Sequence, residues 1–290
     1  MTKYAVDWVD AFTDRPFSGN GCAVVQDAGA LDDATCMAFV AETSLVECTF
    51  VEPSDIADFK VRYFLASREI PFAGHPTIAT VAAFLSRGMV NGTSLTLETG
   101  AGLVAVEIDA SLTPPRISMT QVAPAFGPKL DPVLVAAVGG LTAQDIISPP
   151  QIVSTGLPFC ITVLANQGAL DRCTLDVEAL AALAAASGSD GIDMMEPFWV
   201  TLDGQTTLSR LLMAPPSPAE DAFTGSASGA MAAYLWANGL IKSPHLRATQ
   251  GHMLGRLGQA DVTVQGPPDA ITGVQVAGQA YVLMSGELSL

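Results

Sequence analysis

The predicted elements repeat once along the chain, and this repeat constrains the fold more than any other feature of the sequence. Arg62 lies in an alternating strand and is followed by Glu69 and then by a glycine that begins a helix; Arg210, Glu220 and Gly225 follow in the same order. Each copy contains a strand, an acidic residue and a helix start, and the two copies lie in different halves of the chain. We therefore interpret the repeat as a duplicated sheet-and-helix unit and not as a short-period solenoid. We therefore expect two similar lobes that face each other across a cleft.

The repeat divides the chain near its middle. We expect strands at 4–12, 22–26, 45–51, 58–65, 94–98, 103–108, 116–120, 160–164, 208–213, 261–264, 273–276 and 280–284, and helices at 33–44, 74–87, 176–186 and from 225 onward. Turn-forming residues from Pro124 to Pro132 mark the boundary. The expected fold is α+β, with an N-terminal lobe over 1–125 and a C-terminal lobe over 126–290, whose last strand can return to the first lobe.

Composition excludes several kinds of partner. The 290 residues suffice for two domains with their own cores, yet no apolar run reaches the roughly 18 to 20 residues of a membrane helix. With 29 acidic and 13 basic residues, the formal charge of −16 repels nucleic acid and anionic membranes. The first residues alternate like a strand and lack the layout of a signal peptide, so we expect a cytoplasmic protein.

Metal, thiol and nucleotide motifs are missing from the sequence. Its five cysteines form no CxxC pair and its three histidines no spaced ligand pair, so we expect buried free thiols and no metal site. The segment Gly225–Gly229 has Ala227 at its centre, where a serine-hydrolase elbow needs serine. The glycines form neither a dinucleotide fingerprint nor a phosphate loop.

Two predicted helix starts are candidate anion sites. One lies at Gly74-His75 and the other at Gly225-Ser226, at matching places in the two copies. The first turn of a helix presents backbone N–H groups without intrahelical partners and the positive end of the helix dipole. A small carboxylate between the two starts would accept hydrogen bonds from both.

Three residues are candidates for proton transfer, and each has a structural alternative. Glu47 is the one charge in an apolar, strand-like run, where desolvation would raise a carboxyl pKa as a general acid/base requires, but it also fits an outward-facing charge on an edge strand. His75 is either a proton-transfer partner or a helix-capping histidine. Asp221 is either a site residue or a turn residue. Arg62 and Arg210 are expected to pair with the acids that follow them.

The segments that carry these residues resemble the PhzF-like phenazine-biosynthesis proteins, which share the fold of diaminopimelate epimerase. The resemblance covers nearly the whole chain and rests on Val6-Asp7 to Phe12-Thr13, Pro16 to Asn20, Ala41-Glu42 through Glu47 to Val51, Arg62 to Phe64, Glu69 to Thr77, Glu220 to Ala227, Gln250-Gly251 and Gly255-Arg256. The signatures at Gly74-His75 and Asp221 to Ser226 are specific together.

The resemblance implies an isomerase of two lobes, each a sheet wrapped round a central helix, with the active site in the cleft. It implies no cofactor and a homodimer. The residue matching Glu47 acts in the family as general acid/base on a cyclic dihydro-hydroxyanthranilate, supported by those matching His75 and Asp221. The residues matching Gly74, Gly225 and Ser226 hold the substrate carboxylate.

Several positions depart from related patterns. The related cysteine epimerases carry a cysteine just before the glycine of each helix start, where this chain has Ala73 and Thr224, which excludes a two-thiol racemisation. Val46 stands where a small polar residue precedes the glutamate in PhzF-like proteins. Ala66-Ser67 and Ala222 stand where that pattern has proline. These departures leave the catalytic set intact and bear on the substrate.

The sequence supports two hypotheses from different classes. The first is a cofactor-independent isomerase in which Glu47 moves a proton on a small, carboxylate-bearing metabolite. The second is a non-catalytic carboxylate-binding protein that keeps the fold and has lost the reaction. A racemase that uses one glutamate with another base is a third, weaker hypothesis.

Overall fold

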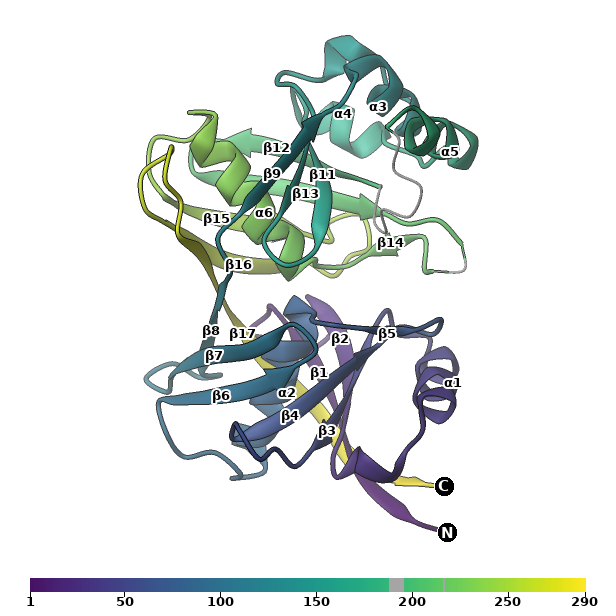
Figure 1. Ribbon diagram of the computed structural model, residues 1–290, viewed down its shortest axis with the longest axis vertical. Helices are drawn as coiled ribbons and strands as arrows, with labels where there is room; N and C mark the ends of the chain where they lie inside the picture. The colour runs from purple at the N-terminus through teal and green to yellow at the C-terminus, as the bar shows by residue number, and fades with distance from the viewer. Residues whose placement is uncertain (188–195, 216) are drawn as a thin grey trace. The chain divides into compact units, whose positions relative to one another are not determined.

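The computed structural model describes residues 1–187, 196–215 and 217–290. The chain forms two compact units (Figure 1). Unit 1 contains Met1–Thr120, Arg256–Ala260 and Ala277–Leu290, and unit 2 contains Gln121–Gly255 and Asp261–Val276. The main division therefore falls at 120/121, whereas the sequence predicts 125/126. Two later segments of the chain complete unit 1.

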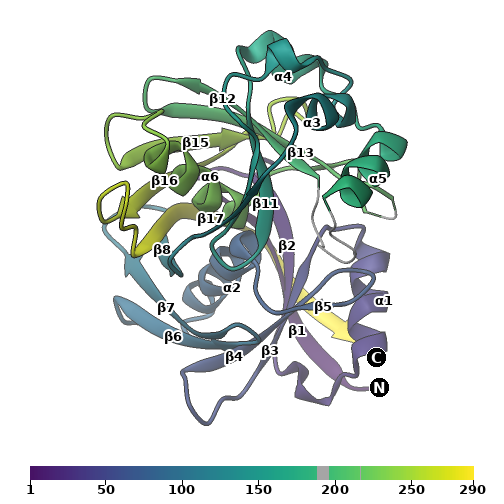
Figure 2. The ribbon, with the colours of Figure 1, turned by 45° about the horizontal axis from the view of Figure 1, so that its top comes forward.

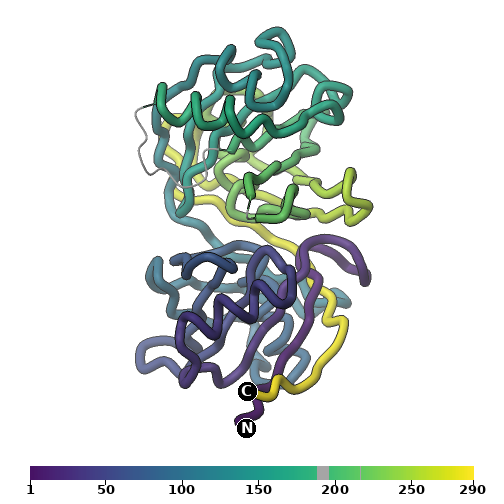
Figure 3. The backbone as a smooth tube through the Cα atoms, turned by 90° about the vertical axis from the view of Figure 1, so that its right-hand side faces the viewer, coloured from purple at the N-terminus to yellow at the C-terminus, as the bar shows by residue number. Residues whose placement is uncertain are grey.

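Unit 1 is a mixed sheet whose pairings close into a ring. Its elements are β1 (Lys3–Ala11), β2 (Asn20–Val25), α1 (Asp33–Thr43), β3 (Cys48–Glu52), β4 (Phe59–Phe64), β5 (Glu69–Ile70), α2 (Gly74–Ser86), β6 (Ser94–Thr99), β7 (Gly102–Asp109), β8 (Arg116–Gln121) and most of β17 (Gly273–Ser289). Strand pairing runs from β17 through β1, β2, β3, β4, β6, β7 and β8 back to β17. The first and last strands lie side by side, so the two chain ends meet (Figure 3).

Helix α2 is buried among the strands of unit 1 (Figure 2). The sequence predicts a single apolar face, but every residue from Gly74 to Phe84 is buried. A helix buried all round needs apolar or small residues on every side, and its polar side chains need partners. The hydroxyl of Thr77 donates to the carbonyl of Ala73 at 2.7 Å, and that of Thr80 donates to the carbonyl of Pro76 at 2.7 Å. The two threonines therefore satisfy their hydroxyls inside the helix.

Helix α1 covers the outer face of β3 and β4. Phe39 of α1 meets Phe50 edge-on, with ring centroids 5.9 Å apart, and Phe50 meets Phe64 in the same way at 5.4 Å. Such pairs contribute about 0.5–1.5 kcal/mol each beyond the area they bury. Asp32 caps the helix, because its side chain accepts a hydrogen bond from the backbone of Thr35. This packing holds α1 against the sheet, and the helix ends at Thr43, before Glu47.

Unit 2 repeats the strand directions of unit 1. Its elements are β9 (Ala125–Lys129), α3 (Pro132–Val138), β10 (Gln151–Ser154), β11 (Pro158–Val163), α4 (Gln167–Arg172), α5 (Val177–Ala186), β12 (Pro197–Asp203), β13 (Thr206–Leu212), β14 (Glu220–Asp221), α6 (Gly225–Ala237), β15 (His245–Gln250) and most of β16 (Gly258–Gln265). In unit 1 the parallel pairs are β2 with β3 and β4 with β6. The corresponding parallel pairs in unit 2 are β11 with β12 and β13 with β15. Helix α6, like α2, connects the second parallel pair and is buried from Gly225 to Leu235.

A hydrophobic core lies between the sheet of unit 2 and the outer helices of that unit. Val135 and Val138 of α3, Leu170 of α4 and Leu183 of α5 pack together with Trp199 of β12. Each of these side chains is buried, so the three short helices cover the face of the sheet opposite α6. No helix in the described part of the chain is long and apolar enough to cross a membrane.

Several predicted elements differ from the structure. Glu47 precedes β3 instead of lying inside a strand, because the left-handed Ser44 ends α1 and the chain becomes extended only at Cys48. The predicted turn region 124–132 contains β9, an exposed edge strand that accommodates Pro128. The strands predicted at 273–276 and 280–284 are one strand, β17, while β10, β12 and β15 were not predicted.

Gly19, the residue before β2, lies close to the backbone of Ala11 in β1. Substitution of this glycine tests the packing of unit 1. Its φ is +60°, and a Cβ there would lie 2.1 Å from the carbonyl oxygen of Ala11. We expect Gly19→Ala to lower the free energy of unfolding by about 3 kcal/mol or more, because overpacking adds to the cost of a left-handed alanine. Urea denaturation measures this effect.

Gly88→Ala is the matched control, since Gly88 has φ +67° but no atom within 4 Å of the position that a Cβ would occupy. It should cost only about 1–2 kcal/mol. Equal effects of the two substitutions would contradict the assigned clash.

Candidate functional site

The predicted site residues form two groups, one in each unit. The Glu47 cluster comprises Glu47, His75, Asn20 and the first turn of α2 in unit 1. The Asp221 cluster comprises Asp221, Thr224, Gln250 and the first turn of α6 in unit 2. The structure thus brings Glu47 to His75, and Asp221 to Thr224, the residue before Gly225. Asn20 and Gln250 were not predicted as site residues.

The turn between α1 and β3 positions Glu47. Ser44 adopts a left-handed conformation, and the hydroxyl of Thr43 accepts a hydrogen bond from the backbone of Leu45 at 3.4 Å. Parallel pairing then sets Cys48 opposite Ala23, so Glu47 enters beside the beginning of β2. The side chain of Glu47 is 15% exposed. Its carboxylate is therefore largely withdrawn from water and still reachable.

His75 contacts Glu47 as a neutral imidazole. Its Nδ1 lies 3.6 Å from Glu47 Oε2 and 3.2 Å from the side-chain nitrogen of Asn20. Burial lowers the pKa of His75 to about 3, and the backbone of Gly21 offsets this only in part. The contact with Glu47 is therefore not an ion pair at neutral pH. Alternatives in which His75 caps the helix are not supported, because its N-cap residue is Ala73 and no side chain caps that end.

Polar groups line the interior next to the Glu47 cluster. Tyr63 and Thr77 share a hydrogen bond of 2.8 Å between their hydroxyls, and Thr49 and Thr80 share another of 2.8 Å. Burial raises the pKa of the Tyr63 hydroxyl and of the Cys22 thiol, and the charge of Glu47 adds to both shifts. These neighbours are therefore neutral at physiological pH.

In unit 2 a closed hydrogen-bond network holds Asp221 against the start of α6. The hydroxyl of Thr224 donates to Asp221 Oδ2 at 2.6 Å. The buried side chain of Gln250 accepts from the backbone of Thr224 at 3.0 Å and donates to the backbone carbonyl of Asp221 at 2.9 Å. Asp221 is itself buried. Thr224 and Gln250 therefore hold Asp221 in place.

A second buried amide supports the first turn of α6 from the side. Gln121 donates to the carbonyl of Gly225 at 3.1 Å and accepts from the hydroxyl of Thr155 at 2.6 Å. It fits against the helix because Gly229 has no side chain; a Cβ there would lie 1.9 Å from the Gln121 oxygen. The first turn of α6 is thus held from two directions, while its N-cap residue, Thr224, makes no side-chain capping bond.

The predicted arginine pairs are confirmed and lie just before each helix start. Arg62 donates two hydrogen bonds to Glu69, at 2.9 and 2.7 Å, and Arg210 donates two to Glu220, at 3.0 and 2.8 Å. Bidentate pairs of this kind add geometric specificity as well as attraction. Each pair ties a strand of the sheet to the short strand that leads into the central helix.

The cysteines are not candidates for thiol chemistry. All five are free and buried, as predicted. Burial raises every one of their pKa values, to about 11 for Cys36 and about 12 for Cys48, Cys160 and Cys173. Ala73 and Thr224 are the N-cap residues of α2 and α6. Among the described residues, no group of three or more His, Cys, Asp or Glu could hold a metal ion.

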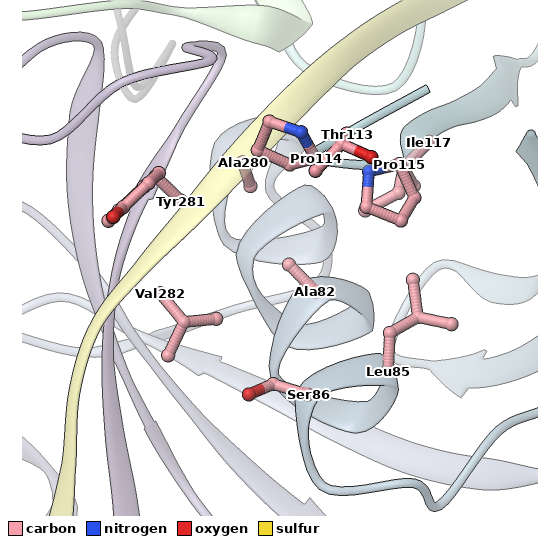
Figure 4. Close-up of a pocket in the computed structure, with 10 residues that line it drawn as sticks. All are labelled: Ala82, Leu85, Ser86, Thr113, Pro114, Pro115, Ile117, Ala280, Tyr281 and Val282. Atoms are coloured by element: carbon pink, nitrogen blue, oxygen red, sulfur yellow. The ribbon is translucent and has the colours of Figure 1, made fainter. Parts of the chain in front are cut away.

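An apolar pocket elsewhere in unit 1 lies apart from these residues (Figure 4). Its volume is about 310 Å³, and it is lined by Ala82 and Leu85 of α2, the turn at Thr113–Pro115, and Tyr281 of β17 with their neighbours. It contains none of the predicted site residues and no carboxylate or imidazole. We therefore place the candidate site at the helix starts.

The buried neutral state of His75 predicts a specific pH dependence of stability. An unfolded histidine binds a proton below its ordinary pKa of 6.5, whereas folded His75 does so only near 3. Its contribution to stability is therefore complete above pH 6.5 and falls as the pH drops toward 3, by up to about 1.4 kcal/mol per unit. Compared with the wild type, His75→Gln should lose less stability between pH 7 and pH 5.

Urea unfolding at the two pH values measures this difference, and groups that titrate in both proteins cancel. His245→Gln is the control, because His245 is exposed and should leave the wild-type pH dependence unchanged. The assignment is wrong if His75→Gln and the wild type lose stability in parallel.

Comparison with known proteins agrees with the resemblance seen in the sequence. The model of the phenazine biosynthesis-like protein family matches residues 9–286. An uncharacterised isomerase, YddE, of Salmonella typhimurium is 33% identical, with 97% of each chain covered. A trans-2,3-dihydro-3-hydroxyanthranilate isomerase of Pseudomonas chlororaphis is 29% identical over the full length of both chains. The crystal structure of a PhzF-family phenazine biosynthesis protein of Bacillus anthracis has 26% identity and a TM-score of 0.86, covering 100% of both chains. The chain belongs to the PhzF family of phenazine biosynthesis-like proteins.

Proposed function

We propose that the protein is an isomerase that moves a proton on a small, carboxylate-bearing and cyclic metabolite, with Glu47 as general acid/base. The observation that carries the proposal is the position of Glu47: a largely buried carboxylate, 3.6 Å from a neutral buried imidazole, beside a helix start without a side-chain cap. The relatives named isomerases support the reaction class.

The proposed step needs only one group that takes and returns a proton. The Glu47 carboxylate removes a proton from carbon, and the electron pair of the broken C–H bond shifts into the adjacent unsaturated system. The glutamic acid so formed then protonates a different carbon of the same system. Glu47 returns to its carboxylate form, and no electrons leave the substrate, so the sum is an isomerisation.

The surroundings of Glu47 suit this role. A neutral His75 supplies no positive charge that would hold Glu47 permanently ionised, yet it can hydrogen-bond to either form. Tyr63 and Cys22, also neutral, add no competing base nearby. Because the side chain of Glu47 is still 15% exposed, its proton can exchange with solvent between the two transfers.

The substrate carboxylate is assigned to the helix starts. Gly74 begins α2 and Gly225 begins α6, and neither N-cap residue caps its helix with a side chain. The backbone N–H groups of these turns, with Ser226, would bind the carboxylate. The overall charge of −16 gives an anion no long-range attraction, so such local donors are required.

Asp221 is assigned a supporting role in the same reaction. It is buried and accepts a short hydrogen bond from Thr224, the residue that precedes Gly225. We therefore propose that it fixes the start of α6 around the substrate and stabilises a polar group of the substrate that changes charge.

Replacing Glu47 tests the proposal. Glu47→Gln keeps the shape of the side chain and removes its basicity. With trans-2,3-dihydro-3-hydroxyanthranilate in D2O as the first probe, the variant should incorporate solvent deuterium about 10²- to 10⁴-fold more slowly than the wild type while still binding the probe. Mass spectrometry measures incorporation, and thermal shift measures binding.

Glu107→Gln, an exposed change on β7 of the same unit, is the matched control and should react at the wild-type rate. Incorporation by Glu47→Gln at the wild-type rate would refute the role of Glu47. Binding of the probe by the wild type without any exchange would instead support a carboxylate-binding protein.

A further inference from the structure

Three of the four asparagines in the chain, Asn20, Asn91 and Asn238, are followed by glycine. Such a pair can react with itself, because the backbone nitrogen of the glycine can attack the side-chain carbonyl carbon of the asparagine. Glycine favours this approach, since it has no side chain and adopts a wide range of backbone conformations. In a folded protein the reaction therefore depends on whether the structure holds the two groups apart.

The pair Asn91-Gly92 is exposed and lies in the loop between α2 and β6. Within the described part of the chain, neither the side chain of Asn91 nor the backbone N–H of Gly92 makes a hydrogen bond. Backbone bonding resumes at Thr93, whose carbonyl accepts from the backbone of Ile108 at 2.8 Å. The two reacting groups of this pair can therefore approach each other without breaking a hydrogen bond.

The pair Asn238-Gly239 is also exposed, but hydrogen bonds hold both of its reacting groups. Asn238 is the C-cap residue of α6, and its side-chain nitrogen donates to the carbonyl of Tyr234 at 2.9 Å. The backbone N–H of Gly239 donates to the carbonyl of Trp236 at 3.1 Å. Attack at this pair first requires the end of the helix to open. Hydrogen bonding, and not exposure, thus distinguishes Asn238 from Asn91.

The third pair, Asn20-Gly21, forms the start of β2 and is protected by burial. Asn20 is 4% exposed, and its side-chain nitrogen lies 3.2 Å from Nδ1 of His75. Gly21 pairs with Asp10 of β1, and a Cβ at Gly21 would lie 3.1 Å from a methyl carbon of Leu45. The sheet holds this pair in an extended conformation, so it can react only after local unfolding.

We propose that Asn91 is a site of spontaneous deamidation in the folded protein, while Asn20 and Asn238 are protected. The Gly92 nitrogen forms a bond to the side-chain carbonyl carbon of Asn91, the bond from that carbon to the amide nitrogen breaks, and the proton lost by Gly92 leaves with the amide as ammonia. Water then opens the cyclic imide at either carbonyl, which gives aspartate or isoaspartate. Nothing is oxidised or reduced.

The modification adds one negative charge to a chain whose formal charge is already −16. The isoaspartate product also lengthens the backbone by one atom, in a loop where no hydrogen bond to Asn91 or Gly92 opposes the change. Neither consequence depends on the proposed isomerase function.

Mass spectrometry of tryptic peptides tests the proposal on the full-length wild type. Trypsin places the three pairs in three different peptides. After incubation at physiological temperature and mildly alkaline pH, we expect the mass of an acid in place of the amide at Asn91, formed about 10-fold or more faster than at Asn20 and Asn238. In urea, where the structure no longer protects them, the three pairs should convert at similar rates.

Gly92→Ala tests the reaction at the attacking residue. The φ of Gly92 is not in the left-handed region, and a Cβ there would lie 3.5 Å from the carbonyl oxygen of Ser94, an ordinary contact, so the variant should fold. Its side chain hinders the approach of the nitrogen, and conversion at Asn91 should slow several-fold. Gly286→Ala is the matched control, because Gly286 is an exposed glycine of unit 1 with room for a Cβ, and should leave the rate at Asn91 unchanged.

Asn91→Gln, whose longer side chain disfavours the five-membered ring, supplies a second reading if Gly92→Ala does not fold; its peptide should keep the amide. Conversion of Asn238 as fast as Asn91 in the folded protein would overturn the proposal. So would an Asn91 that stays intact in the folded protein while the chain in urea converts, or a Gly92→Ala variant that converts at the wild-type rate.

Discussion

Burial of a helix on all sides is the constraint on which both units depend. Neither α2 nor α6 has a face left to water over most of its length, so the strands around them must satisfy every polar group they bring inside. Thr77, Thr80 and Ser228 do so by donating to carbonyls one turn earlier. Small residues let the strands approach closely. The helix starts are where we propose that backbone donors bind the ligand.

The same burial sets the electrostatics of the Glu47 cluster. Burial lowers the pKa of His75, because the charged imidazolium would lose its hydration inside the protein. His75 therefore stays neutral and cannot serve as a fixed positive charge. The thiols and the Tyr63 hydroxyl are neutral for the same reason. Glu47, at the rim of this interior, keeps partial access to solvent. The unit thus surrounds one carboxylate with uncharged polar groups.

Much of the fold was predictable from local patterns. Both helix starts and the pairing of Arg62 and Arg210 with the acids that follow were expected, because each depends on residues close together in the sequence. Glu47 was identified but wrongly placed in a strand, since apolar neighbours suit a buried turn as well as a strand. Long-range pairings were beyond such reasoning.

The missed residues share one property: their partners are remote in the sequence. Asn20 contacts His75, and Gln250 contacts Asp221 and Thr224. The signal that existed was the inclusion of both in the family resemblance, which does not reveal a contact. Edge strand β9 was missed because Gly127 and Pro128 are typical of a turn, although an exposed edge tolerates both.

The pairing of β17 with β1 has a consequence for the order of assembly. The strand that closes the ring of unit 1 is β17, and nearly all of unit 2 lies between it and β8 in the sequence. During synthesis from the N-terminus, the first-made unit therefore cannot complete its ring until unit 2 has been synthesised. Unit 2 has most of its strands available earlier. The half of the protein that carries Glu47 is the first to be made and the last to close.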